Sequence, residues 1–142
     1  MGTITIINLK KLNRGEIGRN DFYVGRANRF FGLRQSALAN PYRLGHDSAE
    51  DRMDIYAMYK RLLWQWIKYK RADVLFELDQ ILQTTQQQEN VRVLCYCAPL
   101  LCHARAVALA IRYFQRQRFW PVSDIIVTGA DKPDPVQAGL FE

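Results

Sequence analysis

One nine-residue segment holds every cysteine of the chain and one of its two histidines: Cys95, Cys97, Cys102 and His103. Thiols and imidazoles act in proteins as nucleophiles, as proton carriers and as zinc ligands. The segment directly follows the apolar run 91–94, which predicts a buried strand, and it precedes a run with helical spacing. In α/β proteins a turn between such a strand and helix lies at the carboxyl edge of the sheet, where ligands bind. The segment is therefore the first candidate site.

The cluster supports two kinds of chemistry. In the first, Cys97 or Cys102 is a nucleophile at the start of the helix, where the helix dipole favours its thiolate, and His103 carries the proton. In the second, the three thiolates, Cys95 included, and the imidazole form the tetrahedral ligand set of a zinc ion. We favour the first and predict no zinc, because Cys102 and His103 are adjacent and so point about 100° apart around a helix axis. Burial in the core is the simpler interpretation of Cys95.

Two further motifs precede this segment, and the three occur in a fixed order: Tyr23-Val24-Gly25-Arg26, then Leu38-Ala39-Asn40-Pro41-Tyr42, then Cys95-Tyr96-Cys97-Ala98-Pro99 with Cys102-His103. Together they resemble the bacterial and phage family called domain of unknown function 4326, which shows Y-[IV]-G-R, L-G-N-P-F and C-W-C-A-P…C-H elements in this order. The likeness spans about residues 20 to 112. The chain has Ala39, Tyr42 and Tyr96 where the family has Gly, Phe and Trp. The family has no settled activity, so the resemblance implies which positions converge and not what reaction they perform.

The first two motifs offer groups that could hold a substrate. The forked guanidinium of Arg26 suits a phosphate or carboxylate, and the Asn40 amide can both donate to and accept from a nucleobase. We predict that these two residues bind the ligand and that Tyr23, Gly25 and Pro41 shape the site with them. The alternatives are a solvated surface role for Arg26 and a simple turn-forming role for Asn40 before Pro41.

Hydrophobic periodicity predicts an alternation of strands and helices. The strands are expected at 3–8, 22–24, 91–95 and 124–129, and the helices at 48–70, 73–83 and 102–117. This order predicts a single three-layer, Rossmann-like α/β domain over residues 1–131, with a mainly parallel sheet of four or five strands. Residues 25–45 follow neither period and predict a long loop.

Composition narrows the functional classes. The chain has 20 Lys and Arg against 14 Asp and Glu, a net charge of +6 that is common in nucleic-acid-binding proteins and also in proteins that bind none. No apolar stretch reaches the roughly 18 residues of a membrane span, and the N-terminus does not resemble a secretion signal. We therefore expect a cytoplasmic protein with reduced thiols and no membrane partner.

The C-terminal residues 132–142 predict a flexible tail that follows a Pro-containing spacer. Its residues Gln137, Leu140 and Phe141 match the Q-x-x-L-F peptide with which bacterial replication and repair proteins bind the sliding clamp. Packing of Leu140 and Phe141 on the domain's own surface is the alternative.

The function that these features favour is a DNA-associated enzyme acting on a nucleotide, a nucleobase or a nucleic-acid end. Cys97 or Cys102 would be the nucleophile, His103 the proton carrier, and Arg26 with Asn40 the substrate-binding groups. Two alternatives remain open at the sequence level. One is a non-catalytic module that binds nucleic acid or a partner protein and holds structural zinc. The other is a sensor of nucleotides or small anions without chemistry.

Overall fold

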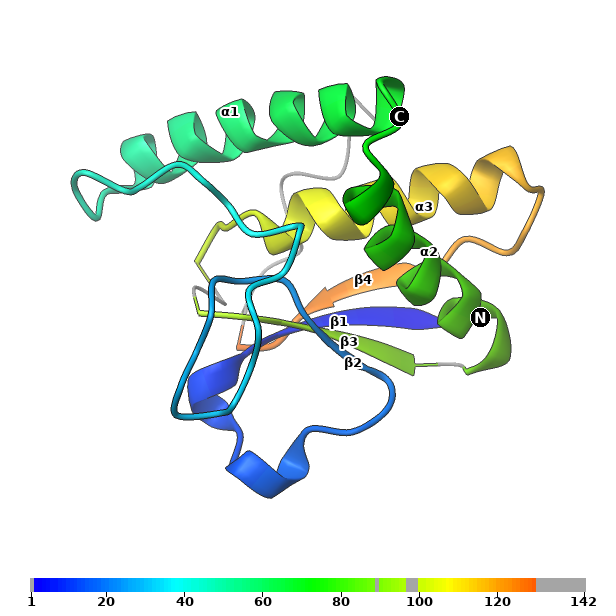
Figure 1. Ribbon diagram of the computed structural model, residues 1–142, viewed down its shortest axis with the longest axis horizontal. Helices are drawn as coiled ribbons and strands as arrows, with labels where there is room; N and C mark the ends of the chain where they lie inside the picture. The colour runs from blue at the N-terminus through cyan, green and yellow to red at the C-terminus, as the bar shows by residue number, and fades with distance from the viewer. Residues whose placement is uncertain (1, 89, 97–99, 130–142) are drawn as a thin grey trace.

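The computed structural model describes residues 2–88, 90–96 and 100–129 (Figure 1). Its elements are, in chain order, β1 (Thr3–Asn8), the 3-10 helices η1 (Leu9–Lys11) and η2 (Arg14–Glu16), β2 (Asp21–Tyr23), α1 (Ala49–Lys68), α2 (Ala72–Gln87), β3 (Asn90–Cys95), α3 (Ala104–Gln117) and β4 (Asp124–Val127). The domain boundary predicted at residue 131 and the tail beyond it lie outside the described residues.

The four strands form one parallel sheet in the order β2-β3-β1-β4. The β3 strand is central, as predicted, and its residues Val93, Leu94 and Cys95 are buried in succession, as expected of a strand that is covered on both faces. A two-pronged ion pair links the edge strand β2 to β3, since Nε and Nη2 of Arg92 each lie 2.6 Å from a carboxylate oxygen of Asp21. This pair sets the position of β2, the strand that leads into the Tyr23 to Arg26 motif.

All three α-helices lie on the same face of the sheet (Figure 1). The side chains of Ile4, Ile6, Val91 and Val93 point to this face and are fully or almost fully buried. The α3 helix packs against both central strands and against the other two helices. Its buried side chains include four alanines, which allow the close approach of its backbone to the sheet: Ala104, Ala106, Ala108 and Ala110.

The opposite face of the sheet is covered by η1, η2 and loop residues. Leu9 and Leu12 bury Leu94 there, with Phe31 and Leu33 packed against them. The predicted three-layer α/β domain with a mainly parallel sheet of four or five strands is therefore confirmed, and the sheet has four strands, all parallel. The layer beneath the sheet consists of short 3-10 helices and loop segments, and the α-helices form the single layer above it.

The predicted elements differ from the observed ones at their ends. The third helix was expected from Cys102 but begins at Ala104, with His103 as its N-cap. The Cys102 carbonyl accepts a hydrogen bond of 3.2 Å from the Arg105 amide, which makes a tight turn ahead of the helix. The last strand ends at Val127 and not at residue 129. Such ends are decided by hydrogen bonding, which periodicity does not report.

The long loop predicted over residues 25–45 is present, and both neighbouring helices hold it. The Glu77 carboxylate of α2 accepts hydrogen bonds from the Ser36 hydroxyl, at 2.6 Å, and from the Ala37 amide. The Tyr59 hydroxyl of α1 donates to the Leu38 carbonyl at 2.6 Å. These contacts fix the backbone just before Asn40. In the described part of the chain, none of the helices has the length and apolarity needed to cross a lipid bilayer.

Candidate functional site

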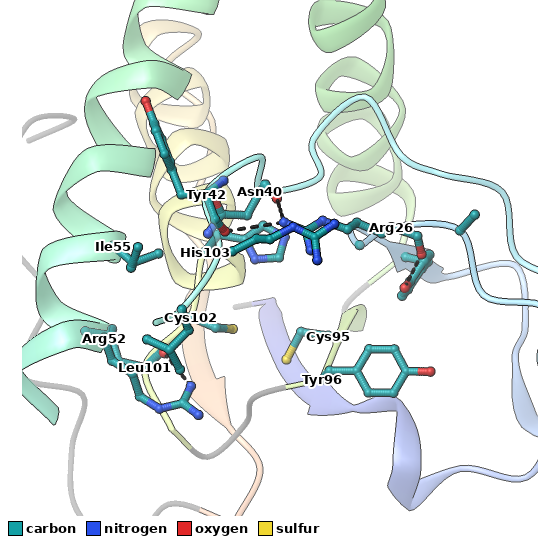
Figure 2. Close-up of a pocket in the computed structure, with 15 residues that line it drawn as sticks. Arg26, Asn40, Tyr42, Arg52, Ile55, Cys95, Tyr96, Leu101, Cys102 and His103 are labelled. Atoms are coloured by element: carbon teal, nitrogen blue, oxygen red, sulfur yellow. Dashed lines mark hydrogen bonds between the residues drawn. The ribbon is translucent and has the colours of Figure 1, made fainter. Parts of the chain in front are cut away.

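A cavity of about 490 Å³ opens at the carboxyl ends of β2 and β3 (Figure 2). The turn after β2 and the loop around Asn40 form one side, α1 contributes Arg52, and the residues that follow β3 and precede α3 form the other side. The volume lies within the range of small-molecule binding sites, roughly 300–1,000 Å³. The carboxyl end of a parallel sheet is also where α/β folds bind their ligands.

The cavity brings the three sequence motifs together. Seven of the residues singled out in the sequence line it: Tyr23, Gly25, Arg26, Asn40, Cys95, Cys102 and His103. Pro41 lines an adjacent cavity of about 550 Å³, which Arg26 and Asn40 also border. The remaining predicted site residues lie outside the described residues: Cys97, Gln137, Leu140 and Phe141.

The turn after β2 is built around Gly25. The Tyr23 ring lies over this glycine, so a Cβ atom at residue 25 would be only 2.5 Å from the Tyr23 hydroxyl oxygen. The hydroxyl donates a hydrogen bond to the Arg26 carbonyl. Burial, reinforced by the nearby Tyr96 and Cys95, raises the pKa of Tyr23 and keeps this donor protonated. Tyr23 therefore holds the turn that directs Arg26 to the cavity.

The Arg26 guanidinium spans the gap between this turn and the loop of the second motif. Its Nη2 atom donates to the carbonyl oxygens of Asn40, at 2.9 Å, and Tyr42, at 3.4 Å. The residue is exposed, and no carboxylate of the described chain forms an ion pair with it. One edge of the guanidinium therefore braces the loop, and the positive charge stays available to an anion.

The Asn40 side chain forms the turn that its position before Pro41 suggested. Its Oδ1 atom accepts a hydrogen bond of 2.9 Å from the Tyr42 amide. This contact occupies the acceptor of the amide group. The Nδ2 group remains as the donor that Asn40 can offer to a ligand.

The protonation state of His103 follows from its contacts. Its Nε2 atom lies 2.6 Å from the carbonyl oxygen of Val24. A carbonyl only accepts hydrogen bonds, so Nε2 carries the proton and Nδ1 has a free lone pair. Burial lowers the pKa of His103, and the positive charge of Arg26 lowers it further, against the opposing effect of the Val24 hydrogen bond. The imidazole is neutral at neutral pH, and Nδ1 is the atom that can take up a proton.

The ring of Tyr59 fixes the orientation of His103. The two rings meet edge to face with their centroids 5.0 Å apart. Burial raises the pKa of the Tyr59 hydroxyl far above its usual value, with smaller contributions from Cys102 and Glu77, so this hydroxyl stays a donor. His103 is thus held on one side by Val24, which directly follows β2, and on the other by Tyr59 of α1.

The two described cysteines border the cavity but are deeply placed. Cys95 is 1% exposed at the end of β3, and Cys102 is 8% exposed just before the N-cap of α3. A substrate reaches either sulfur only by entering the cavity. In the described residues no three His, Cys, Asp or Glu side chains group as metal ligands. The zinc arrangement depends on Cys97, so the absence of zinc stays a prediction.

Sequence reasoning missed two arginines of the cavity, Arg43 and Arg52. Arg43 is exposed and follows the second motif directly. The Arg52 side chain is 14% exposed, and its Nη2 atom forms an ion pair of 2.7 Å with Asp47. Arg43 could have been found from the arginine-rich loop that contains it. No feature of the sequence marks Arg52 as a cavity residue, because an arginine in the first turns of an amphipathic helix is usually solvated.

The chain belongs to the family described as Domain of unknown function (DUF4326), which matches residues 7–112. The matched region contains all of the residues that line the cavity, from Tyr23 to His103. No curated protein and no solved structure matches the chain significantly.

Proposed function

We propose that the cavity binds the phosphate-bearing part of a nucleotide or of a nucleic-acid end. The observation that carries this proposal is its charge: Arg26, Arg43 and Arg52 line the cavity, and the described lining contains no Asp or Glu. Arg52 is ion-paired with Asp47, so Arg26 and Arg43 are the two arginines whose charge carries the argument. Arginines such as Arg26 and Arg43, which form no ion pair with a described carboxylate, favour an anion at a concave site. A planar guanidinium also matches a phosphate with two parallel hydrogen bonds.

The walls of the cavity suit the nucleoside part of such a ligand. Tyr96 contributes an aromatic side chain that is 38% exposed. Aromatic rings stack on nucleobases of any type. The Asn40 Nδ2 group adds a donor for a carbonyl or ring nitrogen of the base. A nucleotide therefore uses both the charged and the aromatic parts of the lining, which inorganic phosphate does not.

The proposed chemistry uses Cys102 and His103, with Cys97 as the other nucleophile that the sequence offers. The thiol proton passes to Nδ1 of His103, and the sulfur forms a bond to an electrophilic centre of the ligand. The leaving group departs with the bonding electron pair and takes the proton from His103. A neutral imidazole at the start of this cycle is the form required of a general base.

A second candidate function is binding without chemistry, as in a nucleotide or anion sensor. The burial of Cys95 and Cys102 favours it, because reactive cysteines are usually partly exposed. The two candidates share the ligand and differ in whether a thiol reacts with it.

Calorimetric titration with a nucleoside monophosphate and with the corresponding nucleoside tests the binding. We expect the monophosphate to bind more tightly, and Arg26→Gln to weaken its binding by about 10- to 100-fold through loss of charged hydrogen bonds. Arg61→Gln, on the exposed face of α1, is the matched control for the loss of one charge. Equal affinities for the two ligands in the wild type would refute the phosphate site.

Labelling of the thiols separates the two candidates. An enzyme with a thiolate at Cys102 should react with iodoacetamide faster than a Cys102→Ser variant near neutral pH, and the nucleotide should slow the reaction. Equal slow labelling of both proteins, with nucleotide binding intact, supports the sensor.

A further inference from the structure

The positive charge of the protein is concentrated in one segment. Residues 10–46 carry eight basic and two acidic side chains, so their net charge equals the +6 of the whole chain. The rest of the sequence is balanced. This segment includes the loops on the left in Figure 1, at the carboxyl ends of the strands beside the cavity. An anion that approaches the cavity therefore meets this surface first.

Part of the segment forms a small hairpin over residues 28–33. Asn28 and Leu33 exchange two backbone hydrogen bonds of 2.9 Å, and the chain reverses at Gly32, whose φ is +66°. The Asn28 side chain accepts a further hydrogen bond of 3.0 Å from the Phe31 amide. The 28–33 hairpin directly follows Ala27, a residue of the cavity lining. The hairpin is therefore an ordered, hydrogen-bonded element at the rim of the cavity.

The two phenylalanine rings of the hairpin meet edge to face, with centroids 5.0 Å apart, but differ in burial. Phe31 packs into the apolar cluster beneath the sheet. Phe30 remains 63% exposed, and the Arg14 guanidinium lies 4.1 Å from the centre of its ring. Phe31 thus anchors the hairpin. Arg14 lies over one face of the Phe30 ring, and the exposed remainder of this ring is presented to solvent.

Two further exposed arginines lie close to Phe30 in the sequence. Arg29 precedes Phe30 in the turn, and Arg34 directly follows the hairpin. Among the described residues, neither of them nor Arg14 forms an ion pair with a carboxylate. An exposed aromatic ring among unpaired arginines is the arrangement that binds single-stranded nucleic acid, where bases stack on the ring and phosphates contact the cations.

We propose that the 28–33 hairpin binds a single-stranded nucleic acid whose terminal nucleotide occupies the cavity. This inference rests on the proposed function and defines its ligand as a polynucleotide end. Paired bases of a duplex cannot stack on Phe30, so a single strand binds more tightly than the duplex. A lipid surface is a poorer partner, because membrane-binding segments require a wide apolar face and the hairpin exposes one ring.

Fluorescence anisotropy with labelled 12-nucleotide DNA and RNA strands tests the inference on the full chain, beside calorimetry with the monophosphate. Phe30→Ala should weaken the binding of at least one strand about 10-fold through lost stacking. Arg29→Gln/Arg34→Gln should reduce the slope of log affinity against log salt by about 1.4, for two phosphate contacts. Neither variant should change the affinity for the monophosphate, because these side chains lie outside the cavity lining.

The double variant Arg61→Gln/Lys68→Gln is the matched control, because it removes two exposed charges from α1. Its affinity for the strands should stay within about twofold of the wild-type affinity, because these charges lie on a distant surface. Circular dichroism melting of each variant verifies folding. The hairpin assignment is wrong if the hairpin variants and the control have equal affinity for both strands while monophosphate binding still depends on Arg26.

Other outcomes separate the two proposals. If the wild type binds neither strands nor monophosphate, the proposed function fails together with the hairpin. If a duplex of the same sequence binds as tightly as the single strand, or vesicles with anionic lipid bind with the same dependence on Phe30, the single-strand inference is overturned.

Discussion

At the scale of single residues, His103 gives the site its sensitivity to pH. Its pKa is lowered in the folded protein, so the unfolded chain binds a proton at a higher pH than the native state does. The free energy of unfolding therefore falls as the pH decreases below about 6.5, the ordinary histidine pKa, until the folded-state pKa is reached. Above about 6.5 this contribution is fully present.

We predict that the imidazole of His103 titrates below about pH 6.5 in an NMR experiment, with its signal assigned by the loss seen in His103→Gln. The variant should also lose part of the decrease in stability between about pH 7 and pH 5, measured by urea unfolding. Titration of the His103 signal above about 6.5 would contradict the neutral imidazole inferred here.

The glycine of the first motif gives a second residue-scale prediction. Gly25→Ala should destabilise the fold by about 1–3 kcal/mol, because its Cβ atom would overlap the Tyr23 ring and force this ring or the turn to move. Urea denaturation measures the change. Gly15→Ala is the matched control, since a Cβ atom at residue 15 meets nothing within 4 Å. Similar losses in both variants would show that the Tyr23 ring is not the cause.

At the scale of elements, the site depends on a loop that the helices hold. Glu77 lies on α2, yet its carboxylate binds Ser36 and Ala37 in the loop that leads to Asn40. A helix thus positions a group of the cavity without lining the cavity itself. The loop is long, and contacts of this kind determine its conformation because it has no periodic hydrogen bonding of its own.

We predict that Glu77→Ala lowers the free energy of unfolding by about 1.5–3 kcal/mol through loss of hydrogen bonds to a charged group. Hydrogen exchange should become faster in residues 36–42, and nucleotide affinity should fall because Arg26 loses its fixed partners. Asp79→Ala on the same helix is the control, because Asp79 is exposed and contacts only Gln83 among the described residues. If the rates of hydrogen exchange over residues 36–42 are the same in both variants, Glu77 does not hold the loop.

At the scale of the whole molecule, the cavity and the positive segment occupy one end of the domain, at the carboxyl ends of the strands. The C-terminal tail continues the chain after β4, whose carboxyl end lies at this same edge because the sheet is parallel.

The match of Gln137, Leu140 and Phe141 to a clamp-binding peptide leads to the last prediction. Leu140→Ala/Phe141→Ala should abolish binding to the bacterial sliding clamp in surface plasmon resonance, because a few apolar anchors carry most of the energy of such contacts. The melting temperature should stay unchanged, and Asp134→Ala should bind like the wild type. A lower melting temperature of the double variant would assign these two residues to the domain's own core.

Local sequence patterns were sufficient for the elements of the fold. In β1 the threonines alternate with the buried Ile4 and Ile6, and in β3 the apolar residues predominate, so both patterns indicate buried strands. The order of strands and helices then predicted a parallel sheet, since parallel strands require crossover connections. The same order of strands and helices is compatible with helices on both faces of the sheet, so the sequence did not predict that all three lie on one face.

Part of the candidate site could also be predicted from the sequence. Motif residues that follow strands were expected at one edge, because parallel strands end together, and Arg26, Asn40, Cys102 and His103 do border one cavity. The sequence by itself thus determined the elements, the edge and the residue types gathered there. Tertiary structure alone decided that Arg52 joins the cavity, that Nε2 of His103 faces a carbonyl, and that the thiols are buried. These features depend on contacts between residues far apart in the chain, and hydrophobic periodicity records only the side on which each residue is buried.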